Sequence, residues 1–239
     1  MSAVLTAPRE NAAHSLNPRQ LQAATHGDGP LLIIAGAGTG KTGTLAHRVA
    51  HLLLNGVAPE AMLLMTFSRR AAQEMIQRAQ TIVGEARPDV AIRLTWAGTF
   101  HAIAAKLLRE YAPQLGLEPQ FSIMDRGDAA DLMDVARQSL DLSRSARRFP
   151  QKDTCLAIYS HRINTQGSLE ATLEEVFPWC AEWEAELTRL YRAYVALKQQ
   201  QQVLDYDDLL LYWHILMQEP ALARDLGERF THVLVDEYQ

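Results

Sequence analysis

The residues best suited to chemistry form a glycine-rich loop. The loop fits the phosphate-loop (Walker A) pattern G-x-x-x-x-G-K-[ST] with alanine at its first position, and consists of Ala35, Gly36, Ala37, Gly38, Thr39, Gly40, Lys41 and Thr42. Glycines let successive backbone N–H groups point at phosphate oxygens, and the start of a following helix adds partial positive charge. Lys41 would reach the β- and γ-phosphates, and the hydroxyl of Thr42 would ligate Mg²⁺. The loop therefore predicts a site for a nucleoside triphosphate, ATP with Mg²⁺, rather than a turn that merely joins a strand to a helix.

A pair of carboxylates far along the chain could complete such a site. Asp236 and Glu237 directly follow an apolar run at residues 231–235. Phosphoryl transfer to water needs the metal held from a second side and the attacking water oriented or deprotonated. We expect Asp236 to hold Mg²⁺ through water and Glu237 to be the general base. The alternative is a solvated acidic turn, but the presence of a phosphate loop in the same chain favours function.

Buried strands must bring these two groups to one edge of a sheet. Short apolar runs predict strands buried on both faces at residues 31–35, 61–67, 91–95 and 231–235. Residues 41–54, 70–83 and 99–111 are predicted as helices, and Asn17 and Pro18 predict the start of an earlier helix that runs to about residue 26. This alternation is typical of a parallel α/β sheet. The carboxyl ends of its strands would meet at the edge that holds the phosphate loop.

A helical block interrupts the α/β pattern. Apart from a brief strand at residues 121–124, we expect helices at residues 128–140, 152–163, 178–201 and 206–217, and a shorter helix before Gly227. Within this block, large side chains recur in steps of three and four at Trp179, Trp183, Leu187, Leu190, Tyr194 and Leu197. Amphipathic helices need such a face for packing, so this stripe favours a core over a ligand site.

Composition limits the possible partners and compartments. The 239 residues include 23 basic and 28 acidic side chains, a formal net charge of −5. Proteins that bind nucleic acid usually carry an excess of Lys and Arg, so a DNA or RNA partner would need a local surface. The two cysteines, Cys155 and Cys180, have no metal-ligand spacing and indicate a reducing compartment. No apolar run suits a membrane span, and residues 1–15 resemble a partly disordered leader rather than a signal peptide. We therefore expect a cytoplasmic protein.

Six motifs, taken in order, carry a resemblance to a known family. They are residues 16–24 (LNPRQLQAA), 35–42 (AGAGTGKT), 66–72 (TFSRRAA), 98–101 (GTFH), 205–209 (DYDDL) and 236–239 (DEYQ). This series closely resembles the UvrD/Rep/PcrA-type superfamily 1 DNA helicases over residues 16–239. The resemblance implies part of an ATP-dependent enzyme that translocates on single-stranded DNA. Its implied partner is single-stranded DNA or a junction of single- and double-stranded DNA.

The resemblance also implies roles for single residues. Gln20 matches the glutamine that reads adenine, because an amide can pair with the donor and acceptor edge of that base. Gln239 matches the glutamine that senses the γ-phosphate and the attacking water. Motifs that contact single-stranded DNA in the family contain Thr66, Phe67, Ser68, Thr99 and His101. The hydroxyls among them could donate to backbone phosphates, and the ring of Phe67 could stack on bases of any sequence. Without the resemblance, Phe67 would be interpreted as a core residue at a strand end, and His101 as an ordinary core or surface histidine.

The family architecture implies a RecA-like P-loop NTPase core with a parallel sheet and an all-helical insertion domain. We accordingly expect a disordered leader at residues 1–15, the first part of the first core domain at 16–113, the insertion domain at 114–203, and the second part of the core domain at 204–239. Residues 205–208 (DYDD) would mark the return to the core. Their carboxylates could equally cap the helix that begins there.

Two features depart from the family pattern. Gly43 stands where close relatives commonly carry an arginine near the adenine, which weakens the inferred contact to the base. The chain also stops at Gln239, inside the Walker B motif and before the second core domain that supplies arginines to the γ-phosphate in this family. We therefore expect this chain to bind nucleotide, to hydrolyse it negligibly and not to unwind DNA alone. The alternatives are a phosphate-loop enzyme of another class, such as a nucleotide kinase, and a non-catalytic DNA-binding module that senses nucleotide.

Overall fold

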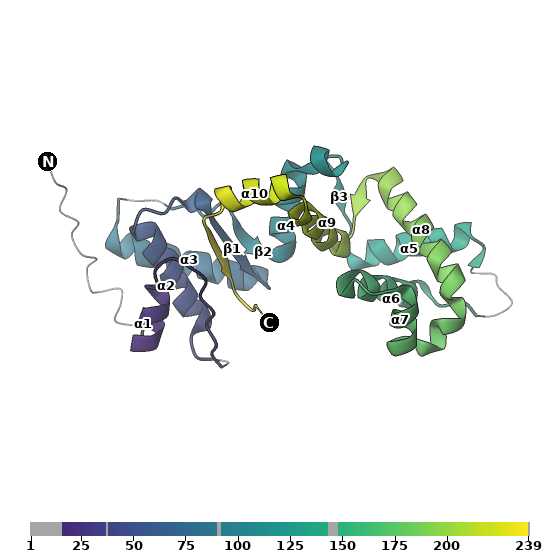
Figure 1. Ribbon diagram of the computed structural model, residues 1–239, viewed down its shortest axis with the longest axis horizontal. Coiled ribbons are helices and arrows are strands. Elements are labelled where there is room, and N and C mark those ends of the chain that lie inside the picture. The colour runs from purple at the N-terminus through teal and green to yellow at the C-terminus, as the bar shows by residue number, and fades with distance from the viewer. Residues whose placement is uncertain (1–15, 37, 90–91, 143–147, 239) are drawn as a thin grey trace. The chain divides into compact units, whose positions relative to one another are not determined.

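The chain folds into two compact units. The computed structural model describes residues 16–36, 38–89, 92–142 and 148–238. Unit 1 joins Met1–Ile103 to Ala221–Gln239, and unit 2 is Ala104–Pro220 (Figure 1). The predicted leader at residues 1–15 lies outside the described residues, as do Ala37 of the phosphate loop and Gln239. In the described part of the chain, no helix is both long and apolar enough to cross a membrane.

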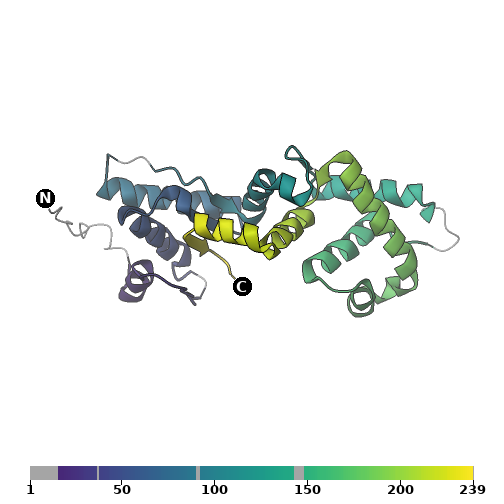
Figure 2. The same cartoon turned by 45° about the horizontal axis from the view of Figure 1, so that its top comes forward.

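A three-stranded parallel sheet forms the centre of unit 1. Its strand order is β2 (Ala97–Thr99), β1 (Met62–Thr66) and β5 (His232–Val235). β5 lies beside β1 although the two strands are far apart in the sequence (Figure 1), and Figure 2 shows β5, in yellow, next to α10. β1 is buried along its whole length, as its unbroken apolar run predicts for the central strand of a covered sheet. The predicted parallel α/β arrangement is therefore confirmed as a small mixed α/β unit.

The helices of unit 1 begin and end near the predicted residues. They are α1 (Pro18–Ala24), α2 (Lys41–Leu54), α3 (Arg69–Ala86), the start of α4 (Phe100–Glu110) and most of α10 (Pro220–Arg229), with a short 3₁₀ turn at Pro59–Ala61. α2 has the predicted bounds, because Gly40 precedes it in a left-handed conformation and Asn55 caps its end. α3 begins after Ser68, whose side chain accepts the N–H of Ala71.

One apolar cluster joins α2 and α3 to the sheet of unit 1. Its buried members come from α2, β1, α3 and β5: Ala46, Val49, Leu52, Met62, Leu64, Met75, Ala79 and Leu234. The small residues Ala46 and Ala79 let the two helices approach closely at the places where they meet. This packing fixes the position of the start of α2 relative to the carboxyl end of β5.

Residues 31–35 do not form the predicted buried strand. They have no strand conformation, and the side chains of Leu32 and Ile34 are 67% and 89% exposed. An apolar run marks a segment that can be buried, but a strand also needs a hydrogen-bonded neighbour. The described sheet ends at β2 on one side and β5 on the other, and residues 31–35 pair with neither. The prediction of a buried, paired strand at residues 31–35 is therefore wrong.

The strand predicted at residues 91–95 is displaced toward the carboxyl end. Ala91 lies outside the described residues, and residues 92–95 are not in a strand, whereas β2 starts at Ala97. The register pairs Leu64 with Ala97 and Thr66 with Thr99, so the position of β2 is set by β1. Pairing with the central strand thus overrides the local apolar pattern.

Unit 2 is mainly helical. Its elements are most of α4, a 3₁₀ turn (Ala112–Leu115), β3 (Ser122–Ile123), α5 (Arg126–Ser139), α6 (Lys152–Thr165), α7 (Leu169–Glu175), a 3₁₀ helix (Pro178–Trp183), α8 (Glu184–Gln201), β4 (Val203–Leu204) and α9 (Tyr206–Gln218). β3 and β4 form a two-stranded parallel sheet. Neither α7 nor β4 was predicted from the sequence. The insertion domain expected at residues 114–203 lies wholly inside unit 2, and its assignment as an insertion stays a prediction.

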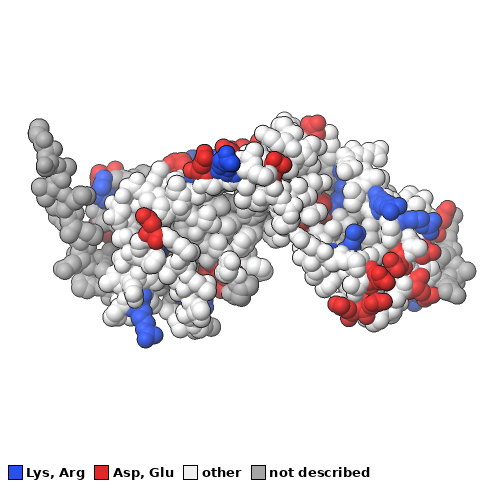
Figure 3. Space-filling view, viewed as in Figure 1, with Lys and Arg blue, Asp and Glu red and all other residues white. Residues whose placement is uncertain are grey.

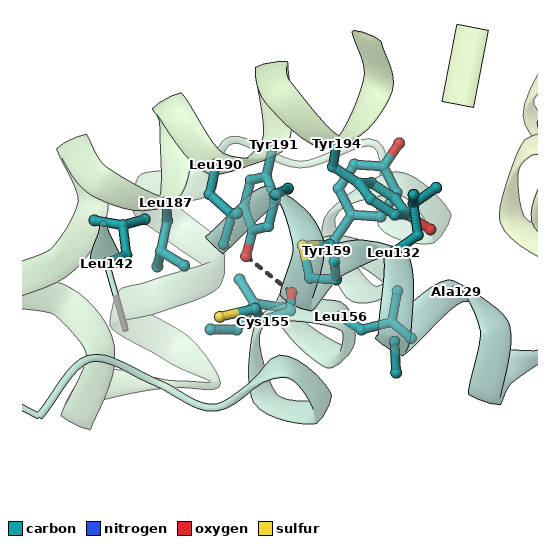
Figure 4. Packing of buried hydrophobic residues seen from close by; sticks show 14 of the residues in the cluster. Ala129, Leu132, Leu142, Cys155, Leu156, Tyr159, Leu187, Leu190, Tyr191 and Tyr194 are labelled. Carbon is teal, nitrogen blue, oxygen red and sulfur yellow. Dashed lines mark hydrogen bonds between the residues drawn. The ribbon is translucent and has the colours of Figure 1, made fainter. Parts of the chain in front are cut away.

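The core of unit 2 holds most of the predicted aromatic face. Figure 4 shows Leu187, Leu190 and Tyr194 of α8 turned toward the side chains of α5 and α6. The hydroxyl of Tyr191 donates to the carbonyl oxygen of Cys155 at 3.0 Å, which satisfies a polar group inside this core. Trp179 is an exception with 68% of its surface exposed, because it lies in the 3₁₀ helix before α8. A 3₁₀ helix has three residues per turn, so Trp179 does not lie on the same face as the residues that α8 buries.

A buried ion group connects α8 to the start of α9. The ammonium of Lys198 lies 2.8 Å from Oδ2 of Asp205 and 2.6 Å from Oδ2 of Asp208. Asp205 also caps α9 by accepting the N–H of Asp208, while Asp208 accepts the N–H of Asp205. The sequence left two roles open for residues 205–208, the return of the chain to the core domain and the capping of a helix. The structure shows the helix cap.

Candidate nucleotide and DNA site

The predicted site residues gather at the carboxyl edge of the sheet in unit 1. Thr66 at the end of β1 pairs in register with Thr99 at the end of β2. On the other side of β1, Met65 pairs with Val235, so Asp236 leaves the sheet at the same level. The backbone N–H of Asp236 still donates to the carbonyl of Met65 at 2.9 Å, which fixes this acid against the central strand. Because the three strands are parallel, one edge collects residues from three distant motifs.

Asp236 meets the phosphate loop at this edge. The hydroxyl of Thr42, in the first turn of α2, donates to Oδ2 of Asp236 at 3.5 Å. Asp236 is only 7% exposed, so its carboxylate is packed within the protein and does not extend into solvent. The two residues are 194 positions apart, and the contact joins the two groups that the sequence assigned to one metal.

The oxygen atoms of Thr42 and Asp236 suit magnesium. This ion usually takes one or two protein oxygen ligands and completes its shell with water and substrate phosphates. Among the described residues no three His, Cys, Asp or Glu side chains cluster as an all-protein metal site. A hydroxyl and a carboxylate beside a phosphate loop therefore fit Mg²⁺ bound together with a nucleotide, rather than a metal held by protein alone.

The backbone of the phosphate loop depends on glycine at two positions. Gly38 and Gly40 have φ angles of 74° and 84°, which lie in the left-handed region that other residues avoid. Gly40 is the N-cap of α2 and has no side chain that could occupy the helix start. The ammonium of Lys41 lies 3.0 Å from the carbonyl of Ala35 and 3.1 Å from that of Gly36, which holds it over the loop. A phosphate bound there would compete with these carbonyls for the same ammonium.

Gln20 links α1 to the phosphate loop. Its Nε2 donates to the carbonyl of Thr39 at 2.9 Å, and its Oε1 accepts the N–H of Asn17 at 2.8 Å. Both ends of the amide are therefore oriented, and each keeps one more hydrogen-bonding position for a ligand. Thr39 is itself held by a 2.7 Å hydrogen bond from its hydroxyl to the carbonyl of Gly36. The segment that follows α1 is fixed to α2, because Arg48 donates to the carbonyl of Gly27 at 3.1 Å.

Glu237 lies next to Asp236 and is exposed. Its φ of 56° places it in the left-handed region, which is uncommon for a residue other than glycine. The chain therefore turns at Glu237, directly after the end of β5. The role of Glu237, like that of Gln239, stays a prediction.

The residues expected to contact DNA differ in exposure. Phe67 is 82% exposed directly after β1, which contradicts the reading of this ring as a core residue. Thr66 is fully buried, and its hydroxyl donates to the carbonyl of Ser68 at 2.9 Å. Thr66 therefore shapes the turn that presents Phe67, and its hydroxyl is already engaged within the chain. The exposed ring and the cap residue Ser68 are available to a ligand.

Thr99 and His101 lie on the neighbouring strand end. The side chain of Thr99 accepts the N–H of Ala102 at 3.3 Å and so helps to start α4. His101, in the first turn of α4, is partly exposed. Because Thr66 and Thr99 are register partners, the two motifs expected to contact DNA lie side by side along one edge.

A pocket of about 620 Å³ opens beside the phosphate loop. Its lining comes from the start of the chain, α2 and α3, and includes Gln20, Gly40, Gly43, His47, Glu74 and Arg78. The family resemblance connected Gln20 and Gly43 with the base, whereas Glu74 and Arg78 were not predicted as site residues. Their spacing of four residues is an ordinary feature of a solvated helix face, so only the packing of α3 on α2 reveals them.

A phosphate loop at the carboxyl edge of a parallel sheet, with a hydroxyl and a carboxylate in contact, defines a site of the P-loop nucleotide-binding class. Comparison with known proteins narrows this class. Residues 16–239 match the model of the UvrD/REP helicase N-terminal domain, and the chain belongs to this family.

Several curated relatives match most of this chain. The ATP-dependent DNA helicase UvrD1 of Mycobacterium tuberculosis (strain ATCC 25618 / H37Rv) is 34% identical over 97% of the chain and 29% of its own length. The ATP-dependent DNA helicase PcrA of Leuconostoc citreum is 33% identical over 96% of the chain and 30% of its own length. The ATP-dependent DNA helicase PcrA of Bacillus subtilis (strain 168) is 32% identical over 94% of the chain and 29% of its own length. The chain thus spans about a third or less of the length of the curated relatives it matches.

Proposed function

We propose that this chain is the ATP-binding N-terminal part of an ATP-dependent DNA helicase that translocates on single strands. The observation that carries the proposal is the 3.5 Å contact between Thr42 and Asp236. It joins the phosphate loop and the acidic motif at one edge of the sheet. Family membership and relatives named ATP-dependent DNA helicases support the same assignment.

Each residue of the site has a separate task in this proposal. Backbone N–H groups from Ala35 to Thr42 and the start of α2 bind the phosphates, and Lys41 moves its ammonium from the loop carbonyls to the β- and γ-phosphates. Thr42 and Asp236 hold Mg²⁺, which neutralises charge that develops on the phosphate oxygens. Glu237 accepts the proton of the attacking water, and Gln239 orients that water. Gln20 presents its remaining donor and acceptor positions to the base.

Single-stranded DNA would bind along the edge marked by the ends of β1 and β2. The exposed ring of Phe67 provides a stacking surface, and Ser68, Thr99 and His101 lie around it. A local surface is required, because Lys and Arg side chains are scattered among acidic ones on the face drawn in Figure 3. Acidic side chains gather there over the part of unit 2 that contains α7, with exposed Glu170, Glu174 and Glu175. That face would repel phosphates and favours unit 1 as the DNA-binding part.

Family membership weighs against the nucleotide-kinase alternative. A kinase would need neither the exposed ring of Phe67 directly after β1 nor the motif at residues 98–101. The non-catalytic module shares the same binding residues and differs from the leading proposal only in turnover.

Nucleotide binding is tested by calorimetric titration of the chain with ATP and Mg²⁺. Lys41→Ala should weaken ATP binding about 10- to 100-fold, because it removes a charge-assisted contact to phosphate. Lys152→Ala is the matched control, since this lysine is on the surface of unit 2 and pairs with Asp131. Equal affinity of wild type and Lys41→Ala would refute the site.

DNA binding is tested separately by fluorescence anisotropy with a labelled oligo(dT) strand. Phe67→Ala should weaken binding about 5- to 100-fold through the loss of one stacked base. Trp179→Ala removes another exposed aromatic ring and should leave DNA affinity unchanged. Lys41→Ala should also leave it unchanged in the absence of nucleotide. If Phe67→Ala binds the strand as well as wild type does, the proposed DNA surface is wrong.

A further inference from the structure

Gly43 lies in the first turn of α2 and leaves space that another side chain fills. Glycine weakens a helix relative to alanine, so its presence inside α2 calls for a local reason. A Cβ atom at Gly43 would lie 3.0 Å from Nη1 of Arg78, which is closer than an ordinary van der Waals contact. The guanidinium of Arg78 therefore lies against Gly43, and a side chain at residue 43 would require it to shift.

Arg78 is held in this place from its own helix. Its Nη2 donates to Oε1 of Glu74 at 3.0 Å, one turn earlier on α3. The order Glu then Arg at this spacing is the favourable one on a helix. One edge of the guanidinium is thus fixed by Glu74, while Nη1 is directed at Gly43. Glu74 sets the orientation that brings the flat guanidinium over the start of α2.

The same guanidinium lines the pocket beside the phosphate loop. Gln20, Gly40 and Gly43 belong to this pocket together with Glu74 and Arg78. Gly40 is both the last glycine of the phosphate loop and a wall of the pocket, so a nucleotide with its phosphates in the loop has its ribose and base directed here. The volume of about 620 Å³ lies within the usual range for small-ligand sites.

We infer that Arg78, made accessible by Gly43, binds the base of the nucleoside triphosphate by stacking its guanidinium on the ring. This inference rests on the proposed function, because it assumes that phosphates occupy the loop of Ala35 to Thr42.

Arg78 and Gln20 then divide the recognition of the base. A guanidinium stacks on any aromatic ring and carries only donors, so Arg78 adds affinity for purine nucleotides without choosing between them. The amide of Gln20 has both a donor and an acceptor and can match the edge of adenine. Loss of Arg78 should therefore weaken ATP and GTP equally, whereas loss of Gln20 should weaken ATP more than GTP.

Calorimetric titration of the chain with ATP, GTP and inorganic tripolyphosphate tests this inference. Arg78→Ala should weaken ATP and GTP binding about three- to 30-fold and leave tripolyphosphate binding unchanged. Arg87→Ala removes an exposed arginine after the end of the same helix and should bind all three ligands as wild type does. Circular dichroism should show equal helix content for both variants.

A second experiment moves the guanidinium from residue 78 to residue 43 and measures nucleotide affinity again. In the Arg78→Ala background, Gly43→Arg should restore much of the lost affinity for ATP and GTP, because the new side chain starts in the same space. Equal loss of tripolyphosphate and ATP affinity in Arg78→Ala would overturn the inference, since Arg78 would then act on the phosphates. Wild-type affinity for ATP in Arg78→Ala would overturn it as well and leave the proposed function intact. If the wild-type chain bound neither ATP nor tripolyphosphate, the proposed function would fail and the inference with it.

Discussion

The side-chain amide of Gln20 donates to the carbonyl oxygen of Thr39 at 2.9 Å, so the first helix is fastened to the phosphate loop before any ligand binds. The same amide caps α1 through Asn17. The proposed recognition of the base and the shape of the phosphate loop would therefore depend on the same side chain. A change at residue 20 should affect both.

Gln20→Glu separates these two roles. Glutamate can still accept the N–H of Asn17 and keep the capping box, but its carboxylate cannot donate to Thr39. We expect unchanged helix content by circular dichroism and a roughly two- to tenfold loss of ATP affinity by calorimetry. Gln22→Glu places the same charge on an exposed position of α1 and is the control. Equal ATP affinities of the two variants would show that the amide contact has no role in binding.

Asp236→Asn should weaken the binding of magnesium together with nucleotide. The amide keeps the shape of the aspartate but not the charge that attracts the cation. We expect the apparent Mg²⁺ affinity in the presence of ATP to fall about 10- to 100-fold. ATP binding measured in EDTA should not change. Glu237→Gln is the control, because the proposed base does not hold the metal, and it should retain the wild-type response to Mg²⁺. An unaltered response in Asp236→Asn would exclude it as a metal ligand.

Lys198→Met should destabilise the fold because it leaves two buried carboxylates without a cation. Lys198 is 3% exposed, and removal of one partner of a buried ion group typically costs about 3–5 kcal/mol. Urea unfolding followed by circular dichroism at pH 7 measures this loss. Lys152→Met breaks an exposed pair with Asp131 and should leave the urea midpoint unchanged.

The loss in Lys198→Met should shrink as the pH falls. Burial raises the pKa of Asp208 to about 6, and the ammonium of Lys198 opposes this rise. A carboxyl whose pKa is higher in the folded than in the unfolded state binds its proton more tightly in the folded state. Its contribution to stability is therefore fully present below the unfolded pKa and is lost as the pH rises through the folded pKa. Without Lys198 the folded pKa should exceed 6, so the variant should recover stability between pH 7 and pH 5. An equal loss at both pH values would contradict this assignment.

The two cysteines should react slowly with thiol reagents in the folded chain. Burial raises the pKa of the Cys155 thiol to about 12 and also raises the pKa of Cys180. The reactive thiolate is therefore scarce at pH 8, and both sulfur atoms are shielded. We expect two fast-reacting thiols per chain in urea and none without it, measured with an aromatic disulfide reagent. Ala181→Cys, at an exposed neighbouring position, should add one fast thiol to the folded chain.

Features with local causes could be predicted from the sequence, and features set by packing could not. The bounds of α2 follow from Gly40 before it and Asn55 after it, and both signals act within one turn. The apolar run at residues 31–35 carries no information about its hydrogen-bonding neighbour, so its prediction as a paired strand was wrong. The exposure of Phe67 could be inferred only through the family resemblance, because an apolar residue at a strand end usually belongs to a core. The approach of Arg78 to Gly43 depends on how α3 packs on α2, which no short pattern records.

The sheet of unit 1 also bears on how this chain behaves at high concentration. β5 is an edge strand of the sheet formed by the described residues, and Val233 on it is 57% exposed. The apolar side chains of Leu32 and Ile34 are exposed in the same unit. An open strand edge together with bare apolar surface is a template for pairing between molecules, which natural sheets usually block with charge or proline. Aggregation through β5 should therefore limit the solubility of this chain, and a lysine in place of Val233 should relieve it.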